Sequence, residues 1–220
     1  MEALLTDIPE KEVLRYLGHD RQIIDADLKA QIERCINSVK SSSRPRLTYT
    51  VREVKDGIIN GLDLGGNDIK ILLSSCKQAI IMAATLGPEA EQMLRRAEVL
   101  NMSDAVILDS AQSTAIENVC DNFEAMMRQK YKEEELYLTD RYSPGYGDLP
   151  MESQKKILDI LFTEKRIGLT LTPSNIMVPR KSVTCIIGIS DQKQRLVLRG
   201  CANCTLNRNC SYRKGGLCHD

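Results

Sequence analysis

The sequence of 220 residues contains no tryptophan, only two phenylalanines and only two histidines. With so few aromatic rings, aliphatic side chains must fill most of the core. Lysine plus arginine and aspartate plus glutamate both number 30, so the formal net charge is zero. A sequence-independent nucleic-acid binder needs an excess of positive charge to displace counterions from phosphates. We therefore expect no nucleic-acid partner.

Long hydrophobic runs are also missing from the sequence. The most apolar stretch, Ala79–Leu86, is much too short to span a bilayer. The first residues carry several charges and no apolar signal-peptide stretch. The expectation is a soluble cytoplasmic protein without a membrane segment.

The eight cysteines fall into two groups. Four are scattered among apolar neighbours, where we expect buried small hydrophobic side chains; these are Cys35, Cys76, Cys120 and Cys185. The other four lie within the last 20 residues and are Cys201, Cys204, Cys210 and Cys218.

Four thiolates this close together can surround one metal centre, and the two-residue spacer of Cys201-Ala-Asn-Cys204 lets the first pair chelate from one turn. An iron–sulfur cluster and a structural zinc ion both fit this pattern, and free or disulfide-bonded thiols stay open as a third possibility. The composition changes at Gly200. We therefore divide the chain into a main domain, residues 1–199, and a small cysteine-rich C-terminal tail, residues 200–220, that binds a metal.

Apolar periodicity predicts helices and short strands that alternate irregularly, which favours the α+β class with a mainly antiparallel sheet flanked by helices. The predicted helices span about residues 9–17, 26–39, 69–73, 88–100, 104–130 and 150–162. The predicted strands span about residues 47–54, 77–87, 137–142, 167–171 and 183–189.

The longest predicted helix has a capping serine, Ser103, and two distinct faces. Its apolar stripe consists of Leu108, Ala111, Ala115, Val119, Phe123 and Met126. The opposite, polar face consists of Ser110, Ser113, Glu117, Asp121 and Glu124.

Residues 141–150 read Arg-Tyr-Ser-Pro-Gly-Tyr-Gly-Asp-Leu-Pro and predict the end of a strand that runs into a tight turn. Pro144 and Gly145 favour the bend, and Gly147 allows a close approach of the backbone. An arginine with paired donors beside exposed backbone amides can form a binding site for a carboxylate. The same residues also fit an ordinary turn with a surface arginine.

This segment resembles the activation domain of cobalamin-dependent methionine synthase, which is marked by Arg, three residues, and then Gly-Tyr. Arg141, Gly145 and Tyr146 match that spacing. Three further segments resemble the family in consistent order: residues 83–87, the helix that bears Glu117, and residues 171–183, which begin Leu-Thr-Pro-Ser. The similarity covers roughly residues 75–190.

The resemblance implies a free-standing reactivation module with a curved α+β domain that binds S-adenosylmethionine in an extended groove. In this family the domain docks on a cobalamin-binding domain whose cobalt has been oxidised to cob(II). A one-electron reduction, from a donor such as a flavodoxin or ferredoxin, is then trapped by methyl transfer from S-adenosylmethionine. The chain would thus be a component of a cobalamin-dependent methyltransferase system of methionine biosynthesis.

The resemblance also implies roles for single residues. Arg141 would hold the carboxylate of S-adenosylmethionine, and the backbone at Pro144 and Gly145 would line the same groove. Tyr146 would be the catalytic residue at the reacting end, near the corrinoid. Glu117 would lie near the positive end of the ligand, although a solvated position on a helix surface fits it equally well.

A departure from the family pattern leaves alternatives open. Gly147-Asp148-Leu149-Pro150 stands where the family usually has Pro-Ala-Cys-Pro. A non-catalytic docking or regulatory partner of a corrinoid protein is therefore an alternative, and an iron–sulfur redox protein built on the cysteine tail is another. The Asp-x-His-x-x-Gly pattern of cobalamin carriers is missing, so we expect the partner to supply the cobalamin.

Overall fold

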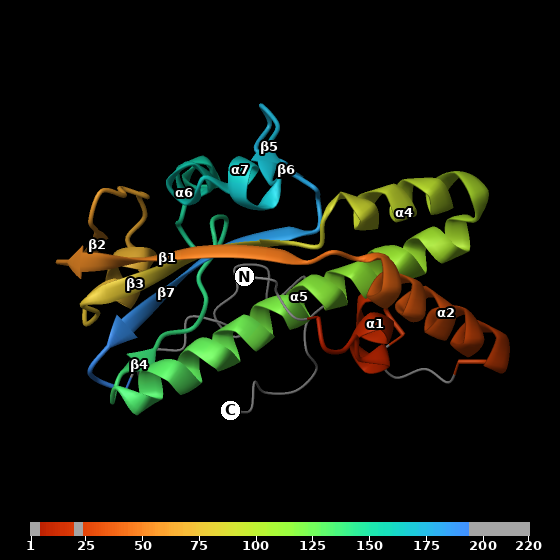
Figure 1. Cartoon of the computed structure of the whole chain (residues 1–220), viewed down its shortest axis with the longest axis horizontal. Coiled ribbons are helices and arrows are strands. Elements are labelled where there is room, and N and C mark those ends of the chain that lie inside the picture. The colour runs from red at the N-terminus through yellow and green to blue at the C-terminus, as the bar shows by residue number, and fades with distance from the viewer. Residues whose placement is uncertain (1–4, 20–23, 194–220) are drawn as a thin grey trace.

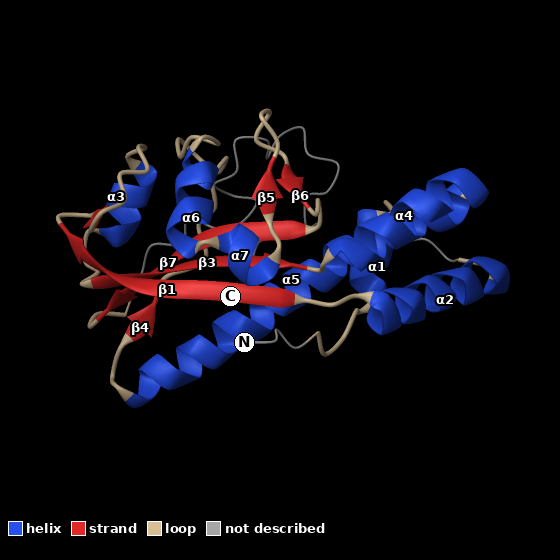
Figure 2. Ribbon diagram, turned by 45° about the horizontal axis from the view of Figure 1, so that its top comes forward, coloured by secondary structure: helices blue, strands red, loops and turns tan. Residues whose placement is uncertain are grey.

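The computed structural model describes residues 5–19 and 24–193. Five strands form one sheet in the order β2-β1-β3-β7-β4, and all neighbouring strands are antiparallel. Helices cover both faces of this sheet (Figures 1 and 2), which confirms the α+β class with an antiparallel sheet. The helices are α1 (Glu10–Tyr16), α2 (Ala26–Ser42), α3 (Asp68–Leu73), α4 (Pro88–Leu100), α5 (Met102–Glu133), α6 (Ser153–Leu161) and α7 (Thr163–Ile167). The strands are β1 (Arg46–Lys55), β2 (Ile58–Ile59), β3 (Gln78–Thr85), β4 (Tyr137–Leu138), β5 (Thr170–Leu171), β6 (Met177–Val178) and β7 (Ser182–Ser190).

The central strand β3 explains the most apolar run of the sequence. It pairs with β1 along one side and with β7 along the other, and every residue after Gln78 is buried. Successive side chains of β3 point to opposite faces of the sheet. Because helices cover both faces, the side chains on both sides of β3 must be apolar. A continuous run from Ala79 therefore replaces the alternation that is seen in β1.

The long helix α5 is the central helix of one helical layer. It crosses the sheet diagonally and packs together with α1, α2 and α4 (Figure 1). Ala111 and Ala115 in its middle are fully buried, and their small side chains let neighbouring elements approach closely.

Two details of α5 differ from the prediction. Its N-cap is Asn101 and not Ser103, because the Asn101 side chain accepts hydrogen bonds from the N–H groups of Ser103 and Asp104. Met127 is buried where the predicted stripe has Met126, whose side chain is exposed. The buried stripe therefore runs through Met127 and continues to Tyr131.

The second helical layer consists of α3, α6 and α7 on the opposite face of the sheet. The turn between Tyr142 and Pro150 lies on this side, where Leu149 is buried in the core. The predicted strand at 137–142 is shorter than expected: β4 contains two residues, and Tyr142 adds an isolated bridge to Ile186. No helix in the described ranges is long and apolar enough to cross a membrane.

Candidate functional site

A β-bulge between β4 and Tyr142 orients the candidate site. Leu138 pairs with Ile189, and Tyr142 pairs with Ile186. The first segment therefore advances four residues between the two pairs, whereas β7 advances only three. The extra residue turns the local backbone. As a result Arg141 points toward α5, whereas Tyr142 lies in the core on the opposite face.

Arg141 contacts three carboxylates of α5. Its Nη2 atom lies 2.5 Å from an oxygen of Asp121 and 3.3 Å from an oxygen of Glu117, and its Nε atom lies 3.2 Å from Glu124. The spacing of these acids along the helix places them on one face, on successive turns. The Arg141 side chain is only 5% exposed. The family resemblance implied that Arg141 and Glu117 belong to one site, and the structure brings them together across 24 residues of chain.

The three acidic partners of Arg141 are not equivalent. The Glu124 side chain is 11% exposed and also pairs with Arg128, at 2.6 Å from its Nη2 atom. Arg128 in turn donates hydrogen bonds to two backbone carbonyls of the 138–139 segment. Glu124 is therefore fixed from both sides. The Glu117 and Asp121 side chains are 45% and 60% exposed, so water can replace their contact with the guanidinium.

The guanidinium of Arg141 retains one unused donor. Burial by itself opposes its charge, but Cys120 and the three carboxylates outweigh burial and raise the pKa of Arg141 above its ordinary value. Arg141 is therefore always protonated. Its Nη1 atom is buried and has no hydrogen-bond partner among the described residues. A buried donor without a partner costs free energy, and an incoming oxygen atom would satisfy it.

The turn that follows Arg141 is anchored on α3 by a carboxylate. Asp148 accepts hydrogen bonds from the backbone N–H groups of Asn67 at 2.6 Å and Asp68 at 3.0 Å. These two bonds lower the pKa of Asp148. Gly147 has φ +50°, and a Cβ there would lie within 2.3 Å of the Tyr142 hydroxyl. The departure from the usual family pattern at 147–148 thus has a structural role of its own.

The other predicted ligand-binding residues lie along this turn. Pro144 is buried and Gly145 is exposed, with φ +89°. Tyr146 is 62% exposed on the outside of the turn, and its ring centroid lies 6.2 Å from that of Tyr142. Arg141 and Glu117 are thus in direct contact, while Tyr146 lies on the surface next to Tyr142. The roles of these residues in ligand binding stay predictions.

Residues 121–201 match the family model described as "Vitamin B12 dependent methionine synthase, activation domain". The resemblance to this family is confirmed. A solved structure described as "Crystal Structure of the MetH Reactivation Domain bound to AdoHcy" is 14% identical to this chain, with a TM-score of 0.59. The similarity covers 82% of this chain and 71% of that chain and shows a shared fold. No curated protein matches the sequence.

The family match includes most of the candidate site. It begins at Asp121 and therefore contains Arg141, Pro144, Gly145 and Tyr146, whereas Glu117 lies just before it. Asp121 and Glu124 were not predicted as site residues. The sequence signal for them was their spacing of four and seven residues from Glu117. Residues at this spacing lie on one face of a helix, so a side chain that contacts Glu117 can also contact them.

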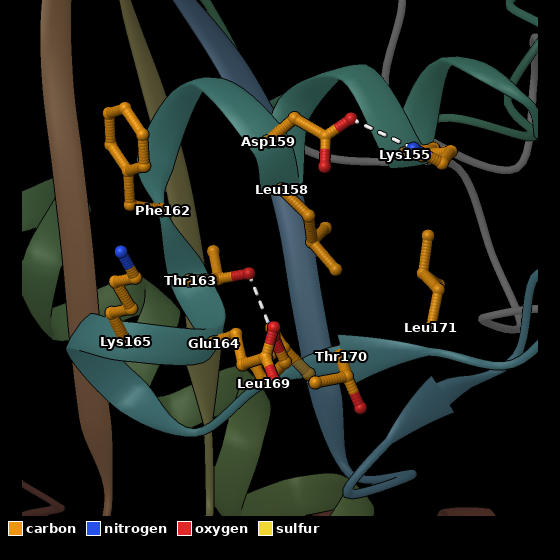
Figure 3. A pocket seen from close by; sticks show the side chains of 10 residues that line it. All are labelled: Lys155, Leu158, Asp159, Phe162, Thr163, Glu164, Lys165, Leu169, Thr170 and Leu171. Carbon is orange, nitrogen blue, oxygen red and sulfur yellow. Dashed lines mark hydrogen bonds and ion pairs between the residues drawn. The ribbon is translucent and has the colours of Figure 1, made fainter.

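A separate pocket lies on the opposite face of the sheet, between α6, α7 and β5 (Figure 3). It has a volume of about 450 Å³, and no predicted site residue lines it. Two contacts join residues of its lining: Lys155 pairs with Asp159 at 3.1 Å, and Thr163 donates to the Leu169 carbonyl at 2.8 Å. This pocket is not part of the Arg141 site.

Four of the cysteines lie in the part of the chain that the structure describes. Cys35, Cys76, Cys120 and Cys185 are buried, as predicted. Burial raises the pKa of Cys35 and of Cys76 to about 11, so both stay protonated at neutral pH. Within residues 5–19 and 24–193, no group of three or more His, Cys, Asp or Glu side chains is arranged to hold a metal ion. The predicted metal ligands, Cys201, Cys204, Cys210 and Cys218, lie outside the described residues.

Proposed function

We propose that this chain is an S-adenosylmethionine-binding reactivation module for a separate cobalamin-dependent methyltransferase of the methionine synthase type. The observation behind the proposal is the contact between Arg141 and Glu117 at a bulged turn. Arg141 and the turn lie inside the region that matches the activation-domain family. The similar solved domain, bound to AdoHcy, supports the choice of ligand class.

The chemistry of the Arg141 site suits such a ligand. The unused Nη1 donor fits one oxygen of the methionine carboxylate. Four carboxylates surround two guanidinium groups here, because Asp140 also lies 3.6 Å from Arg128, so the site has an excess of negative charge. A negative site favours the sulfonium and ammonium charges of S-adenosylmethionine. Glu117, exposed next to the guanidinium, is the acidic side chain that we assign to the positive end.

The protein contributes positioning in this proposal. Arg141 fixes one end of the ligand, the backbone at Pro144 and Gly145 lines its course, and Tyr146 stands exposed at the reacting end. The corrinoid and the methyl acceptor cobalt belong to the partner, and a donor such as a flavodoxin or ferredoxin supplies the electron that reduces cob(II). Holding the methyl group in line with its acceptor and excluding water can together lower the barrier by several kcal/mol.

The cysteine tail extends the proposal. Residues 200–220 would form a unit separate from residues 1–199 and hold an iron–sulfur cluster or a zinc ion on Cys201, Cys204, Cys210 and Cys218. An iron–sulfur cluster would suit a process that needs a low-potential electron. We place the whole system in the cytoplasm, where thiols stay reduced.

Calorimetric titration with S-adenosylmethionine tests ligand binding directly. We expect the wild-type chain to bind, and Arg141→Ala to lose affinity by about tenfold or more, since a charge-assisted contact is lost. Arg95→Ala is the matched control, because it removes the same charge from an exposed pair with Glu91 on α4. Equal affinity of the two variants would contradict the role of Arg141.

Activity is tested with a candidate cobalamin-binding methyltransferase, a reductant and S-adenosylmethionine. Optical spectra report the conversion of cob(II)alamin to methylcobalamin. We expect a higher yield when this chain is present and a loss of that gain with Arg141→Ala. An unchanged yield in the presence of the chain would end the reactivation hypothesis.

One observation favours a second function, a docking protein without ligand. The guanidinium of Arg141 already has three carboxylate partners, as a purely structural arginine would. This alternative predicts no affinity for S-adenosylmethionine in either the wild type or Arg141→Ala. Binding of the chain to the corrinoid protein, measured without S-adenosylmethionine, would then persist in both.

A further inference from the structure

The outer edge of the Arg141 guanidinium has one donor nitrogen that is buried without a partner in the described part of the chain and one that is already bonded. Bidentate recognition of a carboxylate uses two parallel N–H donors, here on Nη1 and Nη2. Nη1 has no partner among the described residues, but Nη2 lies 2.5 Å from Asp121 and 3.3 Å from Glu117. The third acid, Glu124, binds at Nε and does not contact this edge.

A ligand can displace Asp121 more easily than it can displace Glu124. Its side chain is 60% exposed, whereas Glu124 is 11% exposed and is also held by Arg128. A contact to an exposed carboxylate has a low net stability, because water competes for it. Glu117 is farther from Nη2 than Asp121 is, so Asp121 is the main occupant of the donor that a second ligand oxygen needs.

We infer that Asp121 competes with the carboxylate of the ligand for the Arg141 guanidinium and thereby sets the affinity of the site. The inference rests on the proposed function, in which Arg141 binds the methionine carboxylate of S-adenosylmethionine. Asp121 and Glu117 already accept both N–H groups of Nη2, and Glu117 is assigned to the positive end of the ligand, so a ligand oxygen at Nη2 must displace Asp121. Asp121 also attracts the sulfonium, but that charge is several bonds away, and solvent and salt weaken the attraction. Competition at the shared donor therefore dominates.

The variant Asp121→Asn tests the competition, because it removes the charge with little change in shape. We expect it to bind S-adenosylmethionine about two- to fivefold more tightly than the wild type, the upper part of the range for an exposed ion pair. The matched control is Asp159→Asn: this side chain is also helical and exposed, at 66%, and pairs with a lysine on α6, on the other face of the sheet. Thermal unfolding of each variant verifies that the fold is intact.

A ligand without the carboxylate separates competition from general charge effects. Decarboxylated S-adenosylmethionine keeps the sulfonium and the amine, so Asp121→Asn is expected to leave its affinity unchanged or to weaken it. If Asp121→Asn tightens both ligands equally, or tightens neither, the inference is wrong.

The outcomes distinguish this inference from the proposed function. Wild-type binding that depends on Arg141, with no change in Asp121→Asn, overturns the inference alone. Binding of S-adenosylmethionine by Asp121→Asn but not by the wild type supports the inference in its strongest form. If neither protein binds, both the inference and the proposed function are overturned.

Discussion

Arg141→Met removes a buried charge from the edge of the sheet and keeps an apolar stem of similar length. Three contributions decide its effect on the free energy of unfolding. The lost contact with Glu124, which is mostly buried, costs about 1.5–3 kcal/mol, as for a charged hydrogen bond. The contacts with the exposed Glu117 and Asp121 add about 0.2–1 kcal/mol each.

The third contribution has the opposite sign. The wild type buries the Nη1 donor without a partner, and removing it regains about 1–3 kcal/mol. Glu124 keeps Arg128 as its partner and is not left unpaired. We therefore expect Arg141→Met to lower the free energy of unfolding by only about 1–2 kcal/mol, so the variant stays folded.

Urea denaturation with linear extrapolation measures this difference. A loss of about 4 kcal/mol or more would refute the reasoning, because it would show that the fold depends on the ion-pair cluster. Arg141 would then be a structural residue. A small loss of stability combined with a large loss of ligand affinity would support a binding role.

Three other predictions concern the turn and the tail. Gly147→Ala should destabilise the chain by about 2 kcal/mol or more in thermal denaturation, because its Cβ would overlap the Asp68 carboxylate; Gly61→Ala, with φ +75° and nothing within 4 Å, should cost only the backbone strain. Asp148 has a lowered pKa, so its stabilising effect is present above its unfolded value of about 3.8 and is lost as the pH falls through the folded value. The stability difference between wild type and Asp148→Asn should therefore shrink below about pH 4, and a difference that grows there would contradict this assignment. Anaerobically purified protein should contain bound iron with acid-labile sulfide, or else zinc, and Cys201→Ser should lose it; equal metal content in both would exclude the tail site.

The main elements of the fold were predictable because each has a strong local signal. β1 alternates apolar and polar residues, β3 is a continuous apolar run, and α4 begins at Pro88. β2, β6 and α7 were not predicted, since two to five residues are too short to show a period. The cap of α5 was misplaced because Asn101, Ser103 and Asp104 can all cap a helix, and only the backbone geometry selects Asn101.

The candidate site was only partly predictable. The turn residues and Arg141 stand out in the sequence, and the resemblance linked them to Glu117. That Arg141 also meets Asp121 and Glu124 depends on the bulge beside β7 and on the rotation of α5, which local patterns do not contain. The same holds for Asp148, whose bonds to α3 span 80 residues or more.

Arg141 and Tyr142 are consecutive residues whose side chains leave the sheet in opposite directions. The first is tied to α5, and the hydroxyl of the second lies 3.2 Å from Asp68 of α3. One peptide unit thus joins the two outer layers of the molecule. A ligand that moves the guanidinium also rotates this peptide unit. Amide hydrogen exchange at Asn67 and Asp68, on the opposite face of the sheet, therefore reports ligand binding next to α5.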